Sequence, residues 1–263
     1  MKPLVISAPF GNWISSEHAT STLGTYTVQN RAGFFRWWML WRILYTLRYR
    51  PAVGGWTNKL GLPSPGIEHL AKLAVNIPDA WSMERIVSIH GFNEGEWSVL
   101  LDRVKGLGFM AIECNCSCPN VGRLSVPKDL FERAVAALGK DRVIAKLPPV
   151  FYMAMFELAY DSGVRLFHLT NTLPVPAGGL SGKALKRISL DVVKRVKDAR
   201  PDVTIIGGGG ITTPEDVIDF RRAGATHVAV ASALLRPTRG WFRGPRERFL
   251  KEIAQAATAE MHP

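Results

Sequence analysis

The sequence has few of the features that mark secreted, membrane-spanning or multidomain proteins. Its 263 residues contain three cysteines, all between positions 114 and 118, so no disulfide framework is expected and a reducing compartment such as the cytoplasm is the default. Met1-Lys2-Pro3 leads into a short apolar run that ends at Ala8, which is not typical of a signal peptide. No linker, repeat or low-complexity tract divides the chain. We therefore expect a single domain over residues 1–263.

Acidic residues are the scarcer charge, because 22 Asp and Glu stand against 33 Lys and Arg, for a net charge of +11. Such an excess can indicate an anionic partner. The basic residues are scattered, however, and no dense basic run marks a nucleic-acid-binding arm. We interpret the excess as a well-solvated surface and expect no nucleic-acid partner.

Residues 33–50 are the least usual segment, since tryptophan and other apolar side chains are interrupted there by arginines. The segment is too broken to span a bilayer, which takes about 20 apolar residues. Its arginines do not gather on one helical face, so an in-plane amphipathic helix is an imperfect match. Two interpretations stay open. Residues 34–49 contact a membrane surface or a lipophilic electron acceptor, or they form a lid or an oligomer contact, as in a homodimer.

Short apolar segments alternate with helical ones along the chain. Strands are expected at residues 4–8, 25–29, 86–89, 109–115, 143–147, 166–170, 203–206 and 227–230. Helices are expected at residues 15–23, 66–74, 93–105, 127–138, 150–161 and 190–198, after Thr213-Pro214 and after Gly244, with a glycine- and proline-rich loop at 171–185. This alternation predicts an α/β fold with a parallel sheet, and eight strands at this length predict a (β/α)₈ TIM barrel. An open doubly wound sheet is the alternative.

In such a barrel the active site lies at the carboxyl ends of the strands, and polar residues occupy these positions here. The glycine run Gly207 to Gly210 precedes a helix start, which predicts a phosphate site made of backbone amides. The other candidates are Asn58 in the loop after the second strand, Asn115 to Asn120 after the fourth, Lys146 on the fifth, Asn171-Thr172 after the sixth and Ala231-Ser232 after the eighth.

The three cysteines first suggest a metal site. Strand alternation places Cys114 and Cys116 on one face with α-carbons roughly 6.6 Å apart, and zinc sites usually have two or more residues between cysteines. We therefore expect no metal, and we interpret Cys114 and Cys116 as packing thiols. Pro119 forces Cys118 into a loop, where its thiol can meet a ligand.

Lys146 lies in an apolar strand, where a charge without a counter-charge would be costly. An anionic ligand would supply that counter-charge, and a loop carboxylate is the alternative. His168 is expected to be a satisfied barrel or interface histidine rather than a catalyst.

In this order, the motifs resemble those of the dihydroorotate dehydrogenase family of FMN-dependent (β/α)₈ barrels. A single glycine loop would be a weak signal, but an ordered set at the expected strand ends is a strong one. The similar stretches are residues 58–63, 88–91, 115–120, 145–149, 171–172, 178–182, 206–211 and 231–234.

The resemblance implies an oxidoreductase acting on a CH–CH bond, which converts dihydroorotate to orotate in pyrimidine biosynthesis with FMN. Cys118 would remove the C5 proton while the C6 hydride leaves for flavin N5, and a cysteine here resembles the soluble class of the family. Lys146 would stabilise negative charge at the flavin N1/O2 edge. The implied substrate-binding residues are Asn58, Leu60, Gly61, Leu62, Asn115, Asn120, Asn171 and Thr172. The implied flavin-binding residues are Ala8, Gly11, Gln29, Asn115, Lys146, Gly179, Gly209, Gly210, Ala231 and Ser232.

Two departures from the family pattern concern the substrate. Gln29 stands where the family usually has a lysine, so a second positive charge is missing unless Arg31 replaces it. The family's hairpin after this position is replaced by residues 33–50, and the loop after Asn120 is short. The alternatives are therefore an FMN oxidoreductase acting on a related dihydropyrimidine or another small substrate, a non-catalytic flavin-binding barrel, and a non-redox barrel enzyme acting on a phosphorylated substrate.

Overall fold

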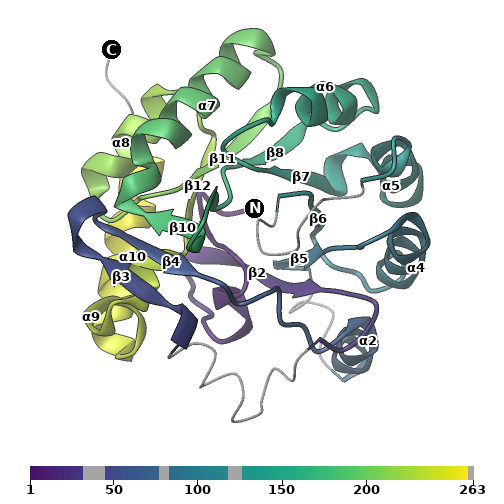
Figure 1. Cartoon of the computed structure of the whole chain (residues 1–263), viewed down its shortest axis with the longest axis horizontal. Coiled ribbons are helices and arrows are strands. Elements are labelled where there is room, and N and C mark those ends of the chain that lie inside the picture. The colour runs from purple at the N-terminus through teal and green to yellow at the C-terminus, as the bar shows by residue number, and fades with distance from the viewer. Residues whose placement is uncertain (32–44, 77–82, 118–125, 260–263) are drawn as a thin grey trace.

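Eight parallel strands close into a barrel in the computed structural model, which describes residues 1–31, 45–76, 83–117 and 126–259. Figure 1 shows the helices arranged around the outside of this barrel. The predicted (β/α)₈ barrel is confirmed, and the open sheet is excluded. In barrel order the strands are β1 (Leu4–Ile6), β12 (His227–Val230), β11 (Thr204–Gly208), β8 (Leu166–Leu169), β7 (Val143–Leu147), β6 (Ala111–Asn115), β5 (Arg85–Ile89) and β2 (Ala19–Tyr26).

Most described α-helices lie close to their predicted positions, although α7 begins four residues before the predicted 190 and α9 was not predicted. Capping explains two of the starts. Asn93 precedes α4, and its side chain accepts a hydrogen bond of 3.0 Å from the amide of Glu96. Thr213 and Asp216 form a capping box at α8. The α-helices are α2 (Ile67–Val75), α4 (Glu94–Val104), α5 (Leu130–Leu138), α6 (Met153–Asp161), α7 (Lys186–Ala199), α8 (Pro214–Arg222), α9 (Pro237–Gly240) and α10 (Arg243–Thr258); the 3₁₀ helices are η1 (Phe10–Asn12), η2 (Pro51–Val53), η4 (Lys140–Arg142), η5 (Lys183–Leu185) and η6 (Ser232–Leu235).

The helix predicted at residues 15–23 is wrong, because most of this segment belongs to the barrel strand β2. β2 pairs in parallel with β1, where Leu4 lies opposite Ala19, and with β5, where Leu23 lies opposite Val87. All of its residues are buried. Its threonines are β-branched and suit a strand between two neighbours. The second barrel strand therefore begins earlier than the predicted 25–29 and ends at Tyr26.

A second, antiparallel sheet was also missed, with the strand order β3 (Arg48–Arg50), β4 (Gly55–Asn58), β10 (Gly178–Gly182) and β9 (Leu173–Val175). Residues 171–185 therefore contain two strands rather than one loop, and Asn58 ends a strand. Gly178 permits the close approach of β10 and β4, because a Cβ there would lie 2.0 Å from the carbonyl oxygen of Asn58. Since β9 follows β8 directly, this sheet lies at the carboxyl end of the barrel.

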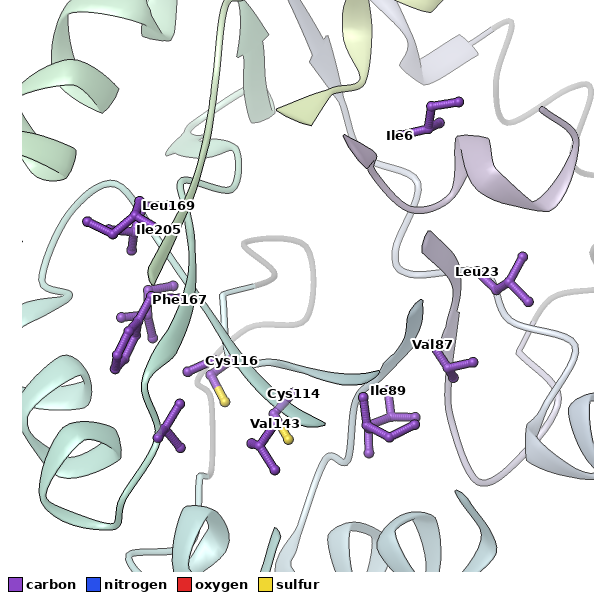
Figure 2. Close-up of a cluster of buried hydrophobic side chains, with 14 of the residues drawn as sticks. Ile6, Leu23, Val87, Ile89, Cys114, Cys116, Val143, Phe167, Leu169 and Ile205 are labelled. Carbon is purple, nitrogen blue, oxygen red and sulfur yellow. The ribbon is translucent and has the colours of Figure 1, made fainter. Parts of the chain in front are cut away.

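The buried apolar side chains of the described residues form two clusters. Side chains that alternate inward fill the barrel interior, and these are Val5, Ile86, Ala111, Ile144, Leu166, Ile206 and Ala229. Their outward neighbours join the larger cluster beneath the helices, in which Figure 2 shows Cys114 and Cys116 near Val143 and Phe167. Both thiols are buried, and burial raises the pKa of Cys114 to about 12. The prediction that they pack is confirmed.

The segment 33–50 is described only from residue 45 onward, so its interpretation as a membrane contact, lid or oligomer contact stays a prediction. Among the described helices, none combines the length and the apolar character needed to cross a membrane.

Candidate active site

A cavity of about 310 Å³ lies at the carboxyl ends of the barrel strands. Inward-facing residues near the ends of six strands line it, namely Thr25, Asn115, Lys146, His168, Gly208 and Ala229. The second sheet contributes Asn58, Ser181 and Gly182 to the wall. The cavity is therefore built at the place where barrels of this kind carry their active sites.

The amides of Asn115 and Asn171 bind each other across this cavity wall. Asn115 Oδ1 accepts hydrogen bonds from the amide of Ser117 at 3.3 Å, its hydroxyl at 3.0 Å and Asn171 Nδ2 at 3.3 Å. Asn115 Nδ2 donates to Thr25 Oγ1 at 3.1 Å. The network ties the end of β6 to β2 and to the loop after β8, so the two amides are held in fixed orientations.

Glu113, Lys146 and His168 form a buried charge cluster on the adjacent strands β6, β7 and β8. Lys146 Nζ lies 3.2 Å from Glu113 Oε1, and His168 Nδ1 lies 2.6 Å from Glu113 Oε2. Strand register explains the meeting, since Lys146 pairs with His168 on one side and with Asn115, two residues after Glu113, on the other. The counter-charge of Lys146 is therefore a strand carboxylate, not the ligand or loop carboxylate expected from the sequence.

Mutual stabilisation keeps Glu113 ionised inside the barrel. Burial alone would raise the pKa of its carboxyl, but the charge of Lys146 and the hydrogen bond from His168 outweigh burial and lower this pKa to about 2. Burial and the nearby Lys146 charge lower the pKa of His168. Because an ionised carboxylate can only accept, Nδ1 of His168 is the donor in its contact with Glu113. The prediction of a satisfied barrel histidine is confirmed.

Gly209 and Gly210 line the cavity directly after β11, with φ of +109° and +94°. Such values suit glycine, because other residues are strained there. A Cβ on Gly209 would lie 2.3 Å from Ser189 Oγ. The start of α8 is capped by its own Thr213 and Asp216, so the glycine loop and the start of η6 are the candidate backbone donors for an anion.

Comparison with known proteins identifies the family. A family model described as dihydroorotate dehydrogenase matches residues 46–244. The catalytic subunit of dihydroorotate dehydrogenase B (NAD(+)) from Alkaliphilus oremlandii is 33% identical over 211 residues, which cover 72% of this chain and 70% of the relative. Dihydroorotate dehydrogenase A (fumarate) from Lactobacillus helveticus is 30% identical over 208 residues, covering 68% of this chain and 66% of the relative. The chain belongs to the dihydroorotate dehydrogenase family. It is accordingly an oxidoreductase that acts on CH–CH bonds.

A solved structure supports the fold of this dihydroorotate dehydrogenase family member. Ligand-free DHODH from Eimeria tenella superposes with a TM-score of 0.71, covers 97% of this chain and 82% of its own, and is 18% identical. At that identity the similarity concerns the barrel alone.

Most of the described candidate residues of this dihydroorotate dehydrogenase family member do line one cavity. They are Ala8, Asn58, Leu60, Leu62, Asn115, Lys146, Asn171, Thr172, Gly209, Gly210, Ala231 and Ser232. Cys118 and Asn120 lie outside the described residues, so their roles stay predictions.

Four described candidates do not line the cavity: Gly11, Gln29, Gly61 and Gly179. Gly11 packs on β2, since a Cβ there would lie 2.3 Å from the carbonyl oxygen of Thr22. Gln29 is exposed. Arg31, its candidate replacement as a cation, is exposed as well and lies 4.2 Å from the centroid of the Phe92 ring. Neither brings a charge to the described cavity wall.

Two features of the site were not predicted from the sequence: the presence of Glu113, and the position of His168 facing the cavity. Alternation along β6 and β8 was the available signal, because Glu113 lies two residues before Asn115 and His168 pairs with Lys146 across the strands. Ser181 and Gly182 were not predicted as lining residues, because a loop rather than two strands was expected at residues 171–185.

Proposed function

We propose that this protein oxidises dihydroorotate to orotate in pyrimidine biosynthesis, with FMN as its cofactor. The observation that carries the proposal is the cavity itself, which is lined by three asparagines, Asn58, Asn115 and Asn171, together with Lys146. Amides both donate and accept hydrogen bonds, so they suit a pyrimidine ring of alternating N–H and C=O groups. Membership of the dihydroorotate dehydrogenase family supports this assignment.

The residues present fit FMN. Gly209 and Gly210, with positive φ and no side chain, would hold the phosphate together with Ala231 and Ser232 at the start of η6. The aromatic and apolar wall near Ala8 would take the ring. Lys146 would lie at its N1/O2 edge. Bound FMN would accept the hydride that leaves C6 of the substrate.

Cys118 would act as the general base that takes the C5 proton. Its chain neighbour Ser117 is anchored through its amide and hydroxyl to Asn115 Oδ1, at 3.3 and 3.0 Å, which fixes the chain at the entry to this loop. Asn115 would thereby position both the substrate ring and the segment that carries the base. Asn120 would complete the set of amides around the ring.

We also propose that the enzyme is cytoplasmic. Three clustered cysteines without a disulfide framework support a reducing compartment. Contact of residues 34–49 with a membrane or a lipophilic electron acceptor, and a homodimer, remain further proposals. Reoxidation of the reduced protein by fumarate, by NAD(+) and by a quinone would show which acceptor it uses.

Anaerobic mixing of the purified yellow protein with dihydroorotate tests the proposal. Dihydroorotate is expected to bleach the flavin absorbance, and orotate is expected to appear in equal amount. Dihydrouracil, which lacks the carboxylate, serves as the matched control for a related dihydropyrimidine substrate. Bound FMN that dihydroorotate does not bleach would refute the substrate, and bleaching by dihydrouracil instead would indicate a related dihydropyrimidine. A protein that takes up no FMN would refute the cofactor.

A further inference from the structure

The imidazole of His168 binds the carboxylate that pairs with Lys146. Its Nδ1 donates to Glu113 Oε2 at 2.6 Å, while Lys146 Nζ binds the other oxygen, Oε1, at 3.2 Å. We propose that His168 is a positioning residue, which occupies one oxygen of Glu113 so that the Lys146 ammonium remains directed at the flavin site. The proposal rests on the proposed function, because it requires flavin in this cavity.

Lys146 is the only Lys, Arg, Asp or Glu among the described residues that line the cavity. An ammonium has three N–H donors. The structure assigns one of them to Glu113 Oε1. The others are available to a ligand as long as Glu113 binds Lys146 through a single oxygen.

Without a donor at position 168, the second oxygen of Glu113 would lose the imidazole hydrogen bond inside the barrel. An unsatisfied buried acceptor is costly, and Lys146 is the nearest charged donor. The carboxylate would then bind the ammonium through both oxygens and draw it away from the cavity. His168 therefore acts through Glu113 and Lys146 rather than on the substrate.

The charges around His168 support its action through Glu113 and Lys146. Glu113 and Lys146 are the charged groups that act on its imidazole, and all three side chains are nearly inaccessible, with exposed fractions of 2% for His168, 1% for Glu113 and 5% for Lys146. A hydrogen bond from Ser88 to the Glu113 carboxylate adds a further restraint. Glu113 itself does not line the cavity, so its carboxylate depends on protein donors.

Three variants of His168 distinguish a role in positioning Lys146 from a role in packing alone. His168→Asn places an amide N–H close to the position of Nδ1 and keeps the bond to Glu113. His168→Gln places its amide one bond farther along, near the position of Nε2, and His168→Leu removes the donor while retaining volume. Each is purified with FMN, its melting temperature is measured, and the midpoint potential of the bound flavin is determined anaerobically against a reference dye.

His168→Leu and His168→Gln are expected to lower the midpoint potential, because a cation near the N1/O2 edge favours the more negative flavin state. The expected shift is about 30 mV, which is tenfold in the equilibrium constant of a two-electron couple. His168→Asn is expected to retain the wild-type potential. If His168→Leu does not fold, the comparison of Gln with Asn decides.

A purely structural role would lower the melting temperature of the variants and leave the flavin potential unchanged in all of them, which would overturn the inference. A potential lowered equally in His168→Asn would overturn it too, since the donor would then be irrelevant. Failure of the wild-type protein to bind FMN would instead overturn the proposed function, and the inference with it.

Discussion

Replacing Glu113 by glutamine should destabilise the protein strongly, because it leaves the Lys146 ammonium buried without its counter-charge. Two unit charges 3.2 Å apart attract each other by about 5 kcal/mol at an effective dielectric of about 20. Removal of one partner from a buried ion pair costs about 3–5 kcal/mol. We therefore expect the free energy of unfolding to fall by about 3–5 kcal/mol in Glu113→Gln, which corresponds to a loss of about 6–20 °C in melting temperature for a chain of this size.

Guanidinium chloride unfolding of the wild-type protein, Glu113→Gln, Lys146→Met and Glu113→Gln/Lys146→Met measures this cost. The double variant leaves no buried unpaired charge, so it should lose less stability than the sum of the two single variants. Strict additivity of the two single losses, or a loss below about 1 kcal/mol in Glu113→Gln, would refute the reasoning, because the pair would then have the strength of an exposed one.

Three further predictions concern pH, catalysis and the glycine loop. The folded-state pKa of Glu113, about 2, lies below its ordinary value of 4.5, so its contribution to stability is fully present above pH 4.5 and is lost as the pH falls toward 2; unfolding curves should show a weaker acid dependence in Glu113→Gln over this window. Cys118→Ala should retain FMN but slow flavin reduction by dihydroorotate at least ~10²-fold in stopped-flow absorbance, and an unchanged rate would exclude Cys118 as the base. Gly209→Ala should weaken FMN binding in a fluorescence titration, because its φ is +109° and its Cβ would lie 2.3 Å from Ser189 Oγ; Gly106→Ala, where a Cβ would meet nothing within 4 Å, is the control and should bind FMN normally.

The strands that could be predicted from the sequence are those whose burial is visible as an apolar run. β7 and β12 were predicted to the residue, because their apolar cores are bounded by polar residues, glycine or proline. Most of β2 was missed because Ala19–Tyr26 is rich in threonine and lacks such a run. Its conformation is decided by pairing with β1 and β5, which are distant in the sequence or separated by a turn. Local propensity does not contain that information.

The candidate site likewise contains residues that could be predicted from the sequence and contacts that could not. The rule that strand ends carry the chemistry of a barrel located Asn115, Lys146 and Asn171 correctly at one cavity. The partner of Lys146 could not be found in this way, since it depends on which residues of β6 and β8 face the same point inside the barrel. The counter-charge of Lys146 was therefore expected from a ligand or a loop carboxylate, whereas Glu113 supplies it from the neighbouring strand.

The internal pairing of Lys146 changes what the cavity can offer a ligand. Gln29 and Arg31 bring no charge to the described wall, so Lys146 is the cation that a flavin edge or a substrate carboxylate would meet there. Its field is partly neutralised by Glu113, which lies 3.2 Å away and does not line the cavity. The extent of that neutralisation depends on how the carboxylate divides its two oxygens between Lys146 and His168. A single imidazole, one strand away from the lysine, thus controls how much positive charge reaches the ligand.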